Sequence, residues 1–417
     1  MLLNFRKIEK NHIIFFSNIL IALFFVTILT FKKGYSYVPI TLGTIATLTF
    51  LYYRLKLKIK WQWDQEDKYL IFALIAYFFT FVLSIIFNGD GIRIIDNPSR
   101  ILLFIPLIFF FALYPIKKNV LFHFIPIGSF ITGILAIYQK FFLELPKPFP
   151  GMMSIQAGDI AISLAMFSIV ISLYWFSINK NGLGILYIVF SAFGLVASIL
   201  SGARGGWVSF PFCILFILAC YYKNLNKKAL LLIISIFTIS ILIFITRAEF
   251  EFAERYSSAK TDVKNYFEKG IKNSSQGARL DMWENGIIAI NEKPLLGHGN
   301  LGYDQFRDRQ IRAQKMAETS SFNSLHNQYL EAFVKRGIIG FTALMVILIV
   351  PLAIFIQRLK SNNNYTKSIA VLGIVHIISH MFFFLTQSFF THTSGTIFYF
   401  FMLILLYHAI KQKENIN

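Results

Sequence analysis

His326 is the residue of this sequence best suited to acid–base chemistry. Asn323 or Ser324 is expected to cap a helix here, which places His326 in the first helical turn. Leu330 and Val334 follow at four and eight residues, so His326 shares the helix face that packs inward. The positive end of the helix dipole disfavours protonation of the ring, and a neutral imidazole can act as a general base. The competing interpretation is a histidine that only packs and caps the helix.

Arg204 and Arg279 are the basic residues whose surroundings suit a phosphate group. Arg204 is the only charge in the glycine-rich turn 201–206, and a guanidinium fork matches phosphate oxygens. Arg279 opens an expected helix, where the dipole is unfavourable for a cation although the helix N-terminus itself binds anions. The alternatives are an interfacial anchor for the first arginine and, for the second, a surface pair with Asp281 or Glu284.

Arg100 is a weaker candidate for the same site. It follows a polar turn at the start of an apolar segment, and an interfacial anchor is the favoured interpretation. His376 and His380 are four residues apart and share a helix face, for which packing or a buried hydrogen bond is favoured over metal binding. The sequence contains no zinc, P-loop or dinucleotide-binding motif, so neither a metal nor a cofactor is expected.

The composition is that of an integral membrane protein. Of the 417 residues, 56% are apolar and 47 are phenylalanine, and stretches of about 20 apolar residues recur along the chain. The net charge of +19 lies mostly in short connections between these stretches. Lipid headgroups are therefore the expected partners of this charge, and nucleic acid is not. Twelve spans are predicted, at 13–31, 37–53, 69–88, 101–116, 119–139, 159–178, 182–200, 206–222, 229–246, 337–357, 367–387 and 393–410.

The distribution of basic residues predicts the orientation. With the N-terminus inside, the inner segments carry 19 Lys and Arg and the short outer connections carry seven. Both termini are therefore expected in the cytoplasm, in agreement with an even number of spans. The outer face, which carries the candidate site, would then be periplasmic.

One connection is much longer than the others. The 79 residues of 247–325 carry charge of both signs and helical periodicity, with helices expected at 249–271 and 278–291. Pro294 and the glycines that follow it are expected to end the second helix. The predicted organisation is nine spans in 1–246, a large, mostly helical outer loop in 247–325, and three spans in 326–417 that begin with the His326 segment.

Several of these segments resemble one protein family. His326-Asn327, nine further residues and Gly337-Ile338-Ile339-Gly340 resemble the signature of the O-antigen ligases of lipopolysaccharide assembly. Three further segments resemble the wider ligase and polymerase superfamily. They are Gly277-Ala278-Arg279-Leu280 with Trp283, Pro294-Leu295-Leu296-Gly297-His298-Gly299, and Ser201-Gly202-Ala203-Arg204. The turn at Arg100 matches more loosely.

The resemblance implies an all-α membrane protein with a GT-C-like glycosyltransferase fold in the bacterial inner membrane. The donor would be a glycan on undecaprenyl diphosphate, and the acceptor a sugar hydroxyl of the lipid A-core. The reaction would be metal-independent and inverting. We assign His326 as the base, Arg279 and Arg204 to the diphosphate, and Arg100 as a third clamp.

Two other enzymes and one other class of protein remain as alternatives. An O-antigen polymerase and a protein O-oligosaccharyltransferase use the same chemistry on a different acceptor. A polytopic transporter or flippase is the rival from another class, because twelve spans are common there. The sequence contains no internal repeat and almost no charge inside the spans, which favours an enzyme.

Overall fold

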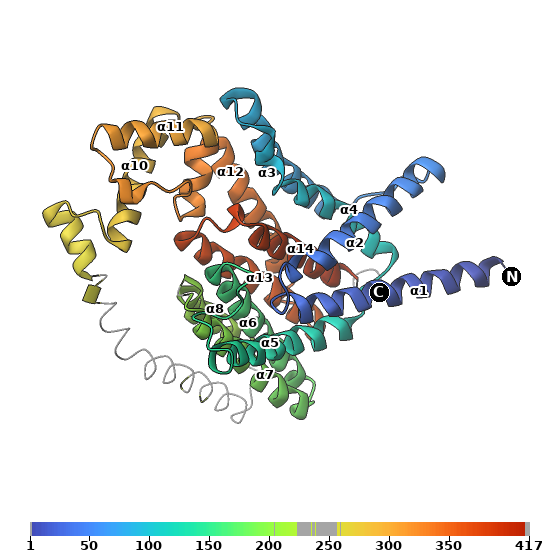
Figure 1. The fold of residues 1–417 in the computed structure, drawn as a ribbon. Helices are drawn as coiled ribbons and strands as arrows, with labels where there is room; N and C mark the ends of the chain where they lie inside the picture. The colour runs from blue at the N-terminus through green and yellow to red at the C-terminus, as the bar shows by residue number, and fades with distance from the viewer. Residues whose placement is uncertain are drawn as a thin grey trace.

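The computed structural model describes residues 2–203, 205–222 and 260–412, together with the single residues 235, 238, 257 and 258. All regular structure in these ranges is helical, and Figure 1 shows the helices gathered into one bundle. The elements in chain order are α1 (Leu2–Thr27), α2 (Gly34–Leu51), η1 (Tyr52–Lys56), α3 (Gln65–Asn88), η2 (Ile92–Ile95), α4 (Ser99–Leu113), α5 (Lys118–Phe141), α6 (Ser154–Ser177), α7 (Asn181–Ser201), α8 (Gly205–Tyr221), α10 (Ser275–Glu292), α11 (Gly299–Arg312), η4 (Glu318–Ser320), α12 (Gln328–Gln357), α13 (Asn364–Thr386), η5 (Phe389–Thr391) and α14 (Thr393–Lys411). The expectation of an all-α membrane protein is confirmed.

Nine helical segments in the described part of the chain are long and apolar enough to cross a membrane. They coincide with nine of the twelve expected spans. The span expected at 37–53 is helix α2, which carries several tyrosine, serine and threonine residues and is less apolar than these nine. The span expected at 206–222 is α8, which has only 17 residues. The span expected at 229–246 falls outside the described residues.

Helices α6 and α14 form the centre of the bundle. Almost every side chain of each is buried, including polar ones such as Ser163 and Thr396. A helix that is apolar on all sides packs on all sides, and Figure 1 shows both surrounded by other helices. Helix α5 can approach α1 closely because of Gly128, where a β-carbon would lie 2.3 Å from the Phe25 carbonyl oxygen.

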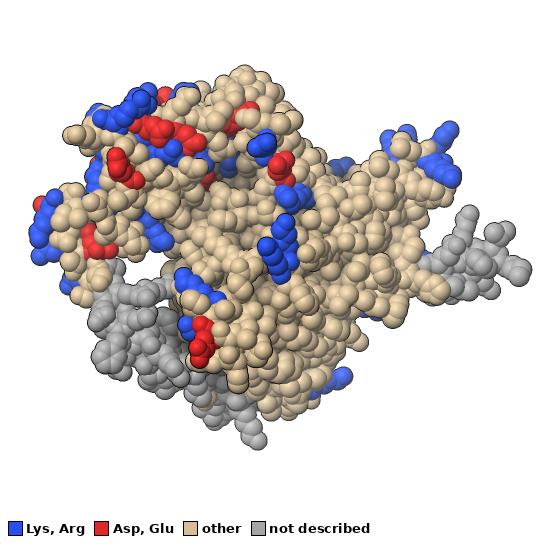
Figure 2. Space-filling model, viewed as in Figure 1, with Lys and Arg blue, Asp and Glu red and all other residues tan. Residues whose placement is uncertain are grey.

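The flank of the bundle exposes large apolar side chains. Phe15 and Phe16 of α1 and Phe72 and Phe87 of α3 each expose half or more of their surface. Figure 2 shows that large parts of the bundle surface carry no charged side chain, whereas charges of both signs gather at the α10–α11 end. Water-soluble proteins rarely expose apolar area on this scale, so this surface faces lipid. The chain is therefore a multi-pass membrane protein.

Helices α10 and α11 lie together at one end of the molecule, at the upper left of Figure 1. The helix expected at 278–291 is confirmed as α10. Of the helix expected at 249–271, residues 260–269 are helical and residues 249–256 are outside the described residues. Helix α11 was not predicted, because only Tyr303 and Phe306 give it a buried apolar face. Its N-terminus is capped by Asp90, whose carboxylate accepts from the Asn300 and Leu301 amides at 2.8–2.9 Å.

Helix α12 is kinked at Gly337, where the backbone has φ 64° and ψ −164°. A β-carbon at Gly337 would lie 2.1 Å from the Leu295 carbonyl oxygen, and one at Gly297 would lie 2.5 Å from the Arg336 amide nitrogen. The Ile338 amide also donates to the Pro294 carbonyl at 2.8 Å. The two glycine-containing segments singled out in the sequence therefore pack backbone against backbone.

Replacement of Gly337 by alanine is expected to destabilise the protein by about 2 kcal/mol or more. This φ/ψ region is essentially restricted to glycine, and the added methyl group would clash with the backbone of residues 294–297. Thermal unfolding in detergent measures the effect. Gly302→Ala in α11 is the matched control, since its β-carbon would lie no closer than 3.5 Å to another residue. Equal melting temperatures for the two variants would contradict this role of the kink.

Candidate active site

A cavity of about 300 Å³ brings His326 and Arg279 together. Arg279 lies in the first turns of α10, and His326 lies in the segment that leads into α12. The residues that line the cavity are Asn273, Ser274, Ser275, Ala278, Arg279, Met282, Thr319, Phe322 and His326. Two of the four candidate residues from the sequence therefore face one space, although 47 positions separate them.

The guanidinium of Arg279 carries no ion pair among the residues that the structure describes. The two carboxylates that could have paired with it have other partners. Asp281 is fully buried and pairs with Lys272 at 2.6 Å, and Glu284 accepts a hydrogen bond from the Tyr266 hydroxyl. Burial lowers the pKa of Arg279 from its ordinary value, because the charged form loses hydration. An anion in the cavity would compensate that loss.

His326 does not lie in the first turn of α12, and this part of the sequence interpretation is wrong. The helix begins at Gln328 and is capped by Asn327, whose side-chain oxygen accepts from the Tyr329 and Leu330 amides at 3.0 and 3.1 Å. His326 precedes the cap with a left-handed backbone, φ 49°. Asn327 stands directly before the first helical residue, which is the N-cap position, whereas Asn323 and Ser324 are further from the helix start. His326 lines the cavity from outside the helix.

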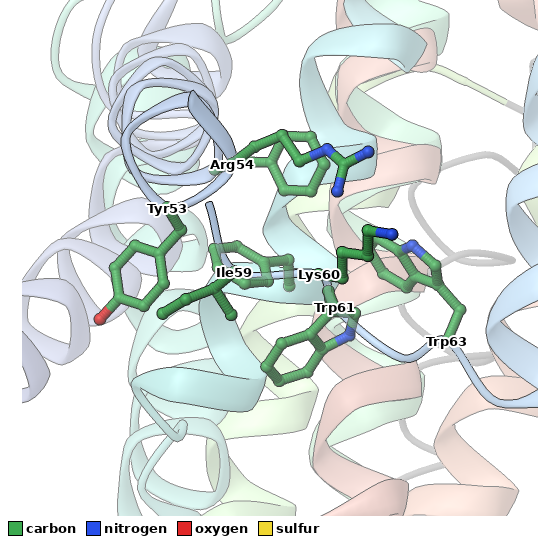
Figure 3. Close-up of a pocket in the computed structure, with 8 residues that line it drawn as sticks. Tyr53, Arg54, Ile59, Lys60, Trp61 and Trp63 are labelled. Carbon is green, nitrogen blue, oxygen red and sulfur yellow. The ribbon is translucent and has the colours of Figure 1, made fainter. Parts of the chain in front are cut away.

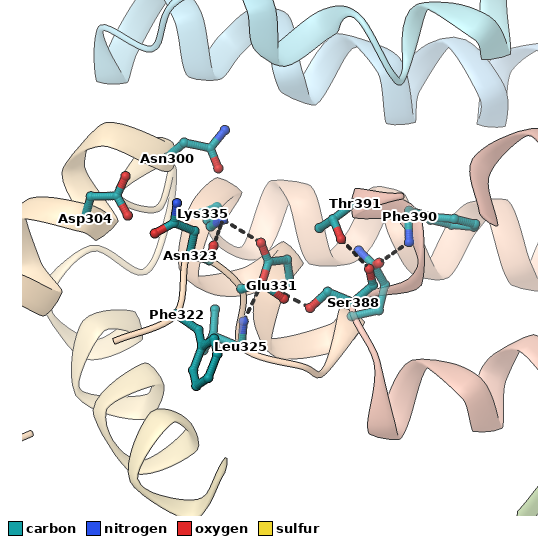
Figure 4. A network of polar contacts seen from close by, with 12 residues as sticks. Asn300, Asp304, Phe322, Asn323, Leu325, Glu331, Lys335, Ser388, Phe390 and Thr391 are labelled. Atoms are coloured by element: carbon teal, nitrogen blue, oxygen red, sulfur yellow. Dashed lines mark hydrogen bonds and ion pairs between the residues drawn. The ribbon is translucent and has the colours of Figure 1, made fainter. Parts of the chain in front are cut away.

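The segment that carries His326 is held from several sides, as a left-handed backbone requires. Trp283 of α10 donates its indole N–H to the Leu325 carbonyl at 2.9 Å. Glu331 of α12 accepts from the Leu325 amide at 2.8 Å and from the Ser388 hydroxyl at 3.2 Å. Lys335, one turn further, donates to the Asn323 carbonyl at 2.7 Å. Figure 4 shows this network joining α12 to the His326 segment and to the α13–α14 connection.

The network depends on a buried ion pair between Glu331 and Lys335, whose side chains are 2.6 Å apart and 2% and 10% exposed. Removal of either partner leaves the other charge buried and unpaired, so Glu331→Gln or Lys335→Met is expected to cost about 3–5 kcal/mol of stability. The Glu331→Gln/Lys335→Met double variant is expected to lose less than the sum of the two. Thermal unfolding of the wild type, the two single variants and the double variant gives the coupling free energy between Glu331 and Lys335. Strictly additive losses of stability would contradict the ion pair.

Gln387 orients the imidazole of His326. The Gln387 side-chain oxygen lies 3.2 Å from Nδ1 of His326, and its nitrogen lies 3.0 Å from Nε2 of His392. An amide oxygen only accepts hydrogen bonds, so Nδ1 of His326 carries the hydrogen. The nitrogen Nε2 of His326 is then left with a free lone pair, which is the form that a general base needs. The Met153 sulfur at 3.7 Å from the Gln387 nitrogen supports this orientation of the amide.

His392 accepts the hydrogen bond of Gln387 only while its Nε2 is unprotonated. Burial lowers the pKa of His392, and repulsion between the protonated forms of His392 and His326 lowers it further, while the Glu331 carboxylate raises it. The unfolded chain restores the ordinary pKa of about 6.5. The stability that the folded protein gains from a neutral His392 is therefore fully present above pH 6.5, and it is lost as the pH falls through the lower pKa of His392 in the folded state.

We expect the melting temperature in detergent to fall between pH 7.5 and pH 5.5, and to fall less in His392→Gln, which cannot be protonated. The measurement is a thermal scan at each pH. His12→Gln, at an exposed histidine of α1, is the control and should keep the wild-type pH dependence. An unchanged pH dependence in His392→Gln would contradict the assignment.

Arg204 and Arg100 are the other two candidate arginines. Arg204 lies outside the residues that the structure describes. Arg100 does not line the cavity, and its guanidinium donates to the Asp96 carbonyl of its own turn. The neighbouring Asn97 ties that turn to the α13–α14 connection through the Phe390 carbonyl at 2.8 Å, and to α14 through the Thr396 hydroxyl at 3.0 Å. The roles of Arg100 and Arg204 stay predictions.

Sequence reasoning missed the residues that position His326. Glu331 lies within the motif itself, five residues after the histidine, and its burial could have been inferred from the inward face of the helix. Gln387 and His392 lie in a short connection between two apolar spans that also carries Ser388 and Thr391, and these polar residues were a usable signal. Arg336 was also missed: its side chain is buried over the Phe81 ring at 4.1 Å, and its Nε and Nη2 find no partner among the described residues.

The comparisons with known proteins agree with these motifs. A family model described as O-antigen ligase matches residues 188–345, which include Arg279, His326 and the Gly337 kink. A protein of Haemophilus influenzae described as uncharacterized is 49% identical over 394 residues, which are 94% of this chain and 98% of that protein. The exopolysaccharide production protein ExoQ of Rhizobium meliloti is 28% identical over 108 residues, 25% of this chain and 24% of that protein. The chain therefore belongs to the O-antigen ligase family.

Proposed function

We propose that this protein transfers a glycan from undecaprenyl diphosphate to a sugar hydroxyl of lipid A-core, as an O-antigen ligase. The observation that carries the proposal is the cavity lined by both Arg279, which forms no ion pair with any described residue, and His326, whose Nδ1 is bound by Gln387. Membership of the O-antigen ligase family supports a membrane enzyme of glycan transfer. The acceptor and the lipid diphosphate are our proposal.

The chemistry follows from the bond that must break. The anomeric carbon of the donor sugar is joined to a diphosphate oxygen, and negative charge grows on that oxygen as the bond lengthens. Arg279 stabilises this charge with fixed donors, and Arg204 and Arg100 are proposed to add to it. Nε2 of His326 takes the proton from the acceptor hydroxyl as its oxygen attacks the anomeric carbon. The diphosphate leaves on its lipid, and the anomeric centre is inverted.

The proposed setting is the inner membrane of a bacterium with both termini in the cytoplasm. The excess of Lys and Arg in the segments on the N-terminal side supports this orientation. The α10–α11 end, with the cavity, then faces the periplasm, where a lipid-linked glycan and the lipid A-core would meet. The spans 1–246 and 326–417 and the intervening loop 247–325 stay our proposed domain division.

Deletion of the gene in its source bacterium tests the acceptor. The lipopolysaccharide is analysed on a gel after complementation with the wild type or with His326→Ala. A bare core with glycan accumulating on its lipid carrier, restored by the wild type alone, is the expected result. A core that carries one repeat but no longer chain identifies a polymerase instead. An unchanged core profile points to transfer onto protein, or to a transporter, and overturns the ligase proposal.

A further inference from the structure

A second cavity, of about 370 Å³, lies at the end of the bundle opposite His326. It forms where the chain leaves α2, makes the π-helical turn η1 and returns to α3. Helix α3 runs the length of the bundle from this cavity to the other end, where Asn88 donates to the Leu296 carbonyl at 3.2 Å. The residues that line the cavity are Phe50, Tyr53, Arg54, Ile59, Lys60, Trp61, Trp63 and Phe109.

The walls of this cavity are aromatic and packed against one another. Phe109 of α4 is the common contact: its ring lies 4.9 Å from that of Trp61 and 5.5 Å from that of Tyr53, edge to face in both pairs. Trp61 in turn contacts Trp63 at 6.3 Å. Such contacts fix the rings, so the cavity is a built feature of the fold and not a gap between mobile side chains. Tyrosine and tryptophan are typical of the headgroup level of a membrane.

Two basic side chains lie at the cavity, and Figure 3 shows Arg54 and Lys60 extending in the same direction on the side of Trp63. The carboxylates nearest in the sequence have other partners. Glu66 pairs with Arg358 at 2.6 Å, and Asp64 and Asp67 both pair with Lys411. In the described part of the protein, Arg54 and Lys60 form no ion pair. The cavity therefore presents uncompensated positive charge above an aromatic floor.

These features select the class of ligand. An aromatic cage alone would suit a quaternary ammonium group, but Arg54 and Lys60 repel a cation at this cavity. The two charges suit a phosphate, and the apolar rings of Phe50 and Phe109 suit the first carbons of an acyl chain. The cavity lies between the end of α2 and the start of α3, and α3 is long and apolar enough to cross a membrane, so lipid headgroups are expected at this level. We propose that it binds the phosphodiester headgroup of an anionic phospholipid from the leaflet on the N-terminal side.

This site is independent of the proposed glycan transfer, because the whole length of α3 separates it from His326. Binding measurements on the full-length protein in detergent test it without any assay of activity. The probes are short-chain phosphatidylglycerol, phosphatidylcholine of the same chain length, and inorganic phosphate. Affinity and the lipid-dependent rise in melting temperature are both recorded.

The decisive variants remove the same charge from two places in one segment. Arg54→Gln/Lys60→Gln takes two charges from the cavity, whereas Lys56→Gln/Lys58→Gln takes two from residues that do not line it. Phosphatidylglycerol is expected to bind the first variant roughly 30-fold more weakly than the wild type, from two lost headgroup charges. The second variant should stay within about threefold, because Lys56 and Lys58 do not line the cavity and act on the lipid only as screened surface charges.

Trp61→Leu is an independent test, because it keeps both positive charges and removes one aromatic ring from the cavity wall. Phosphatidylglycerol is expected to bind this variant more weakly than the wild type. Equal losses of phosphatidylglycerol affinity in the two charge variants would mean that the lipid is attracted by the positive surface as a whole, and this result would overturn the proposed site. Equally tight binding of phosphatidylcholine would remove the anionic selectivity. Inorganic phosphate that matches the affinity of the lipid would assign the cavity to the free ion and overturn the lipid proposal.

Discussion

His326→Ala is expected to lower glycan transfer by about 10²–10⁴-fold, the usual contribution of a general base. The imidazole lines the cavity and is held by the Gln387 side-chain oxygen at 3.2 Å, while a network fixes the backbone before it. With the hydrogen on Nδ1, the lone pair of Nε2 is the one that can accept a proton. Alanine removes the base and leaves the acceptor hydroxyl protonated. The rate of transfer from a lipid-linked glycan, measured with purified protein in lipid, gives the effect.

The loss must come from chemistry and not from folding. His326→Ala should therefore keep a melting temperature close to that of the wild type, because the ring is only partly buried. His12→Ala, at an exposed histidine far along α1, is the matched control and should keep full activity. Gln387→Leu should also reduce the rate, since the imidazole loses the acceptor that sets its tautomer. Near-wild-type activity of His326→Ala would remove the base assignment.

Arg279→Ala is expected to lower the rate by about 10²–10³-fold, comparable to the loss of one preorganised donor at a developing charge. Its guanidinium faces the cavity with no ion pair in the described structure, because Asp281 pairs with Lys272 and Glu284 accepts from Tyr266. No carboxylate among the described residues pairs with it, so a diphosphate in the cavity would meet an available donor. Removal of the donor leaves the leaving group without this stabilisation.

Three variants separate this role from general electrostatics. Arg279→Lys keeps the charge and loses the two-pronged donor geometry, so partial activity is expected. Arg309→Ala removes an equally charged residue of the neighbouring helix that is exposed and paired with Glu292 at 2.7 Å, and it should leave the rate unchanged. Arg279→Ala should also weaken binding of the lipid-linked donor more than that of the acceptor. Equal effects of the Arg279→Ala and Arg309→Ala variants would contradict a specific contact with the diphosphate.

The sequence alone determined the class of the fold, and it proposed two residues, His326 and Arg279, that line one cavity in the structure. Apolar stretches of about 20 residues are local patterns that lipid imposes on every span, so nine of the expected twelve are found in the described structure. Helix α10 could be predicted because its apolar periodicity and the Pro294 that follows it are also local. His326 and Arg279 were proposed from the sequence because each has a side chain suited to catalysis or phosphate binding and lies beside a span or at a helix start. Neither inference required knowledge of the tertiary structure.

Only the tertiary structure decided how these residues meet. The left-handed backbone of His326 is held by Trp283, Glu331 and Lys335 from two different helices. Gln387 reaches the imidazole across 61 positions, and Asp90 caps α11 across 210. Contacts of this kind leave no period in a sequence, because they depend on where separate helices pack. Periodicity reports which face of a helix is buried, whereas the partner of a buried polar group is set by the packing of the whole bundle.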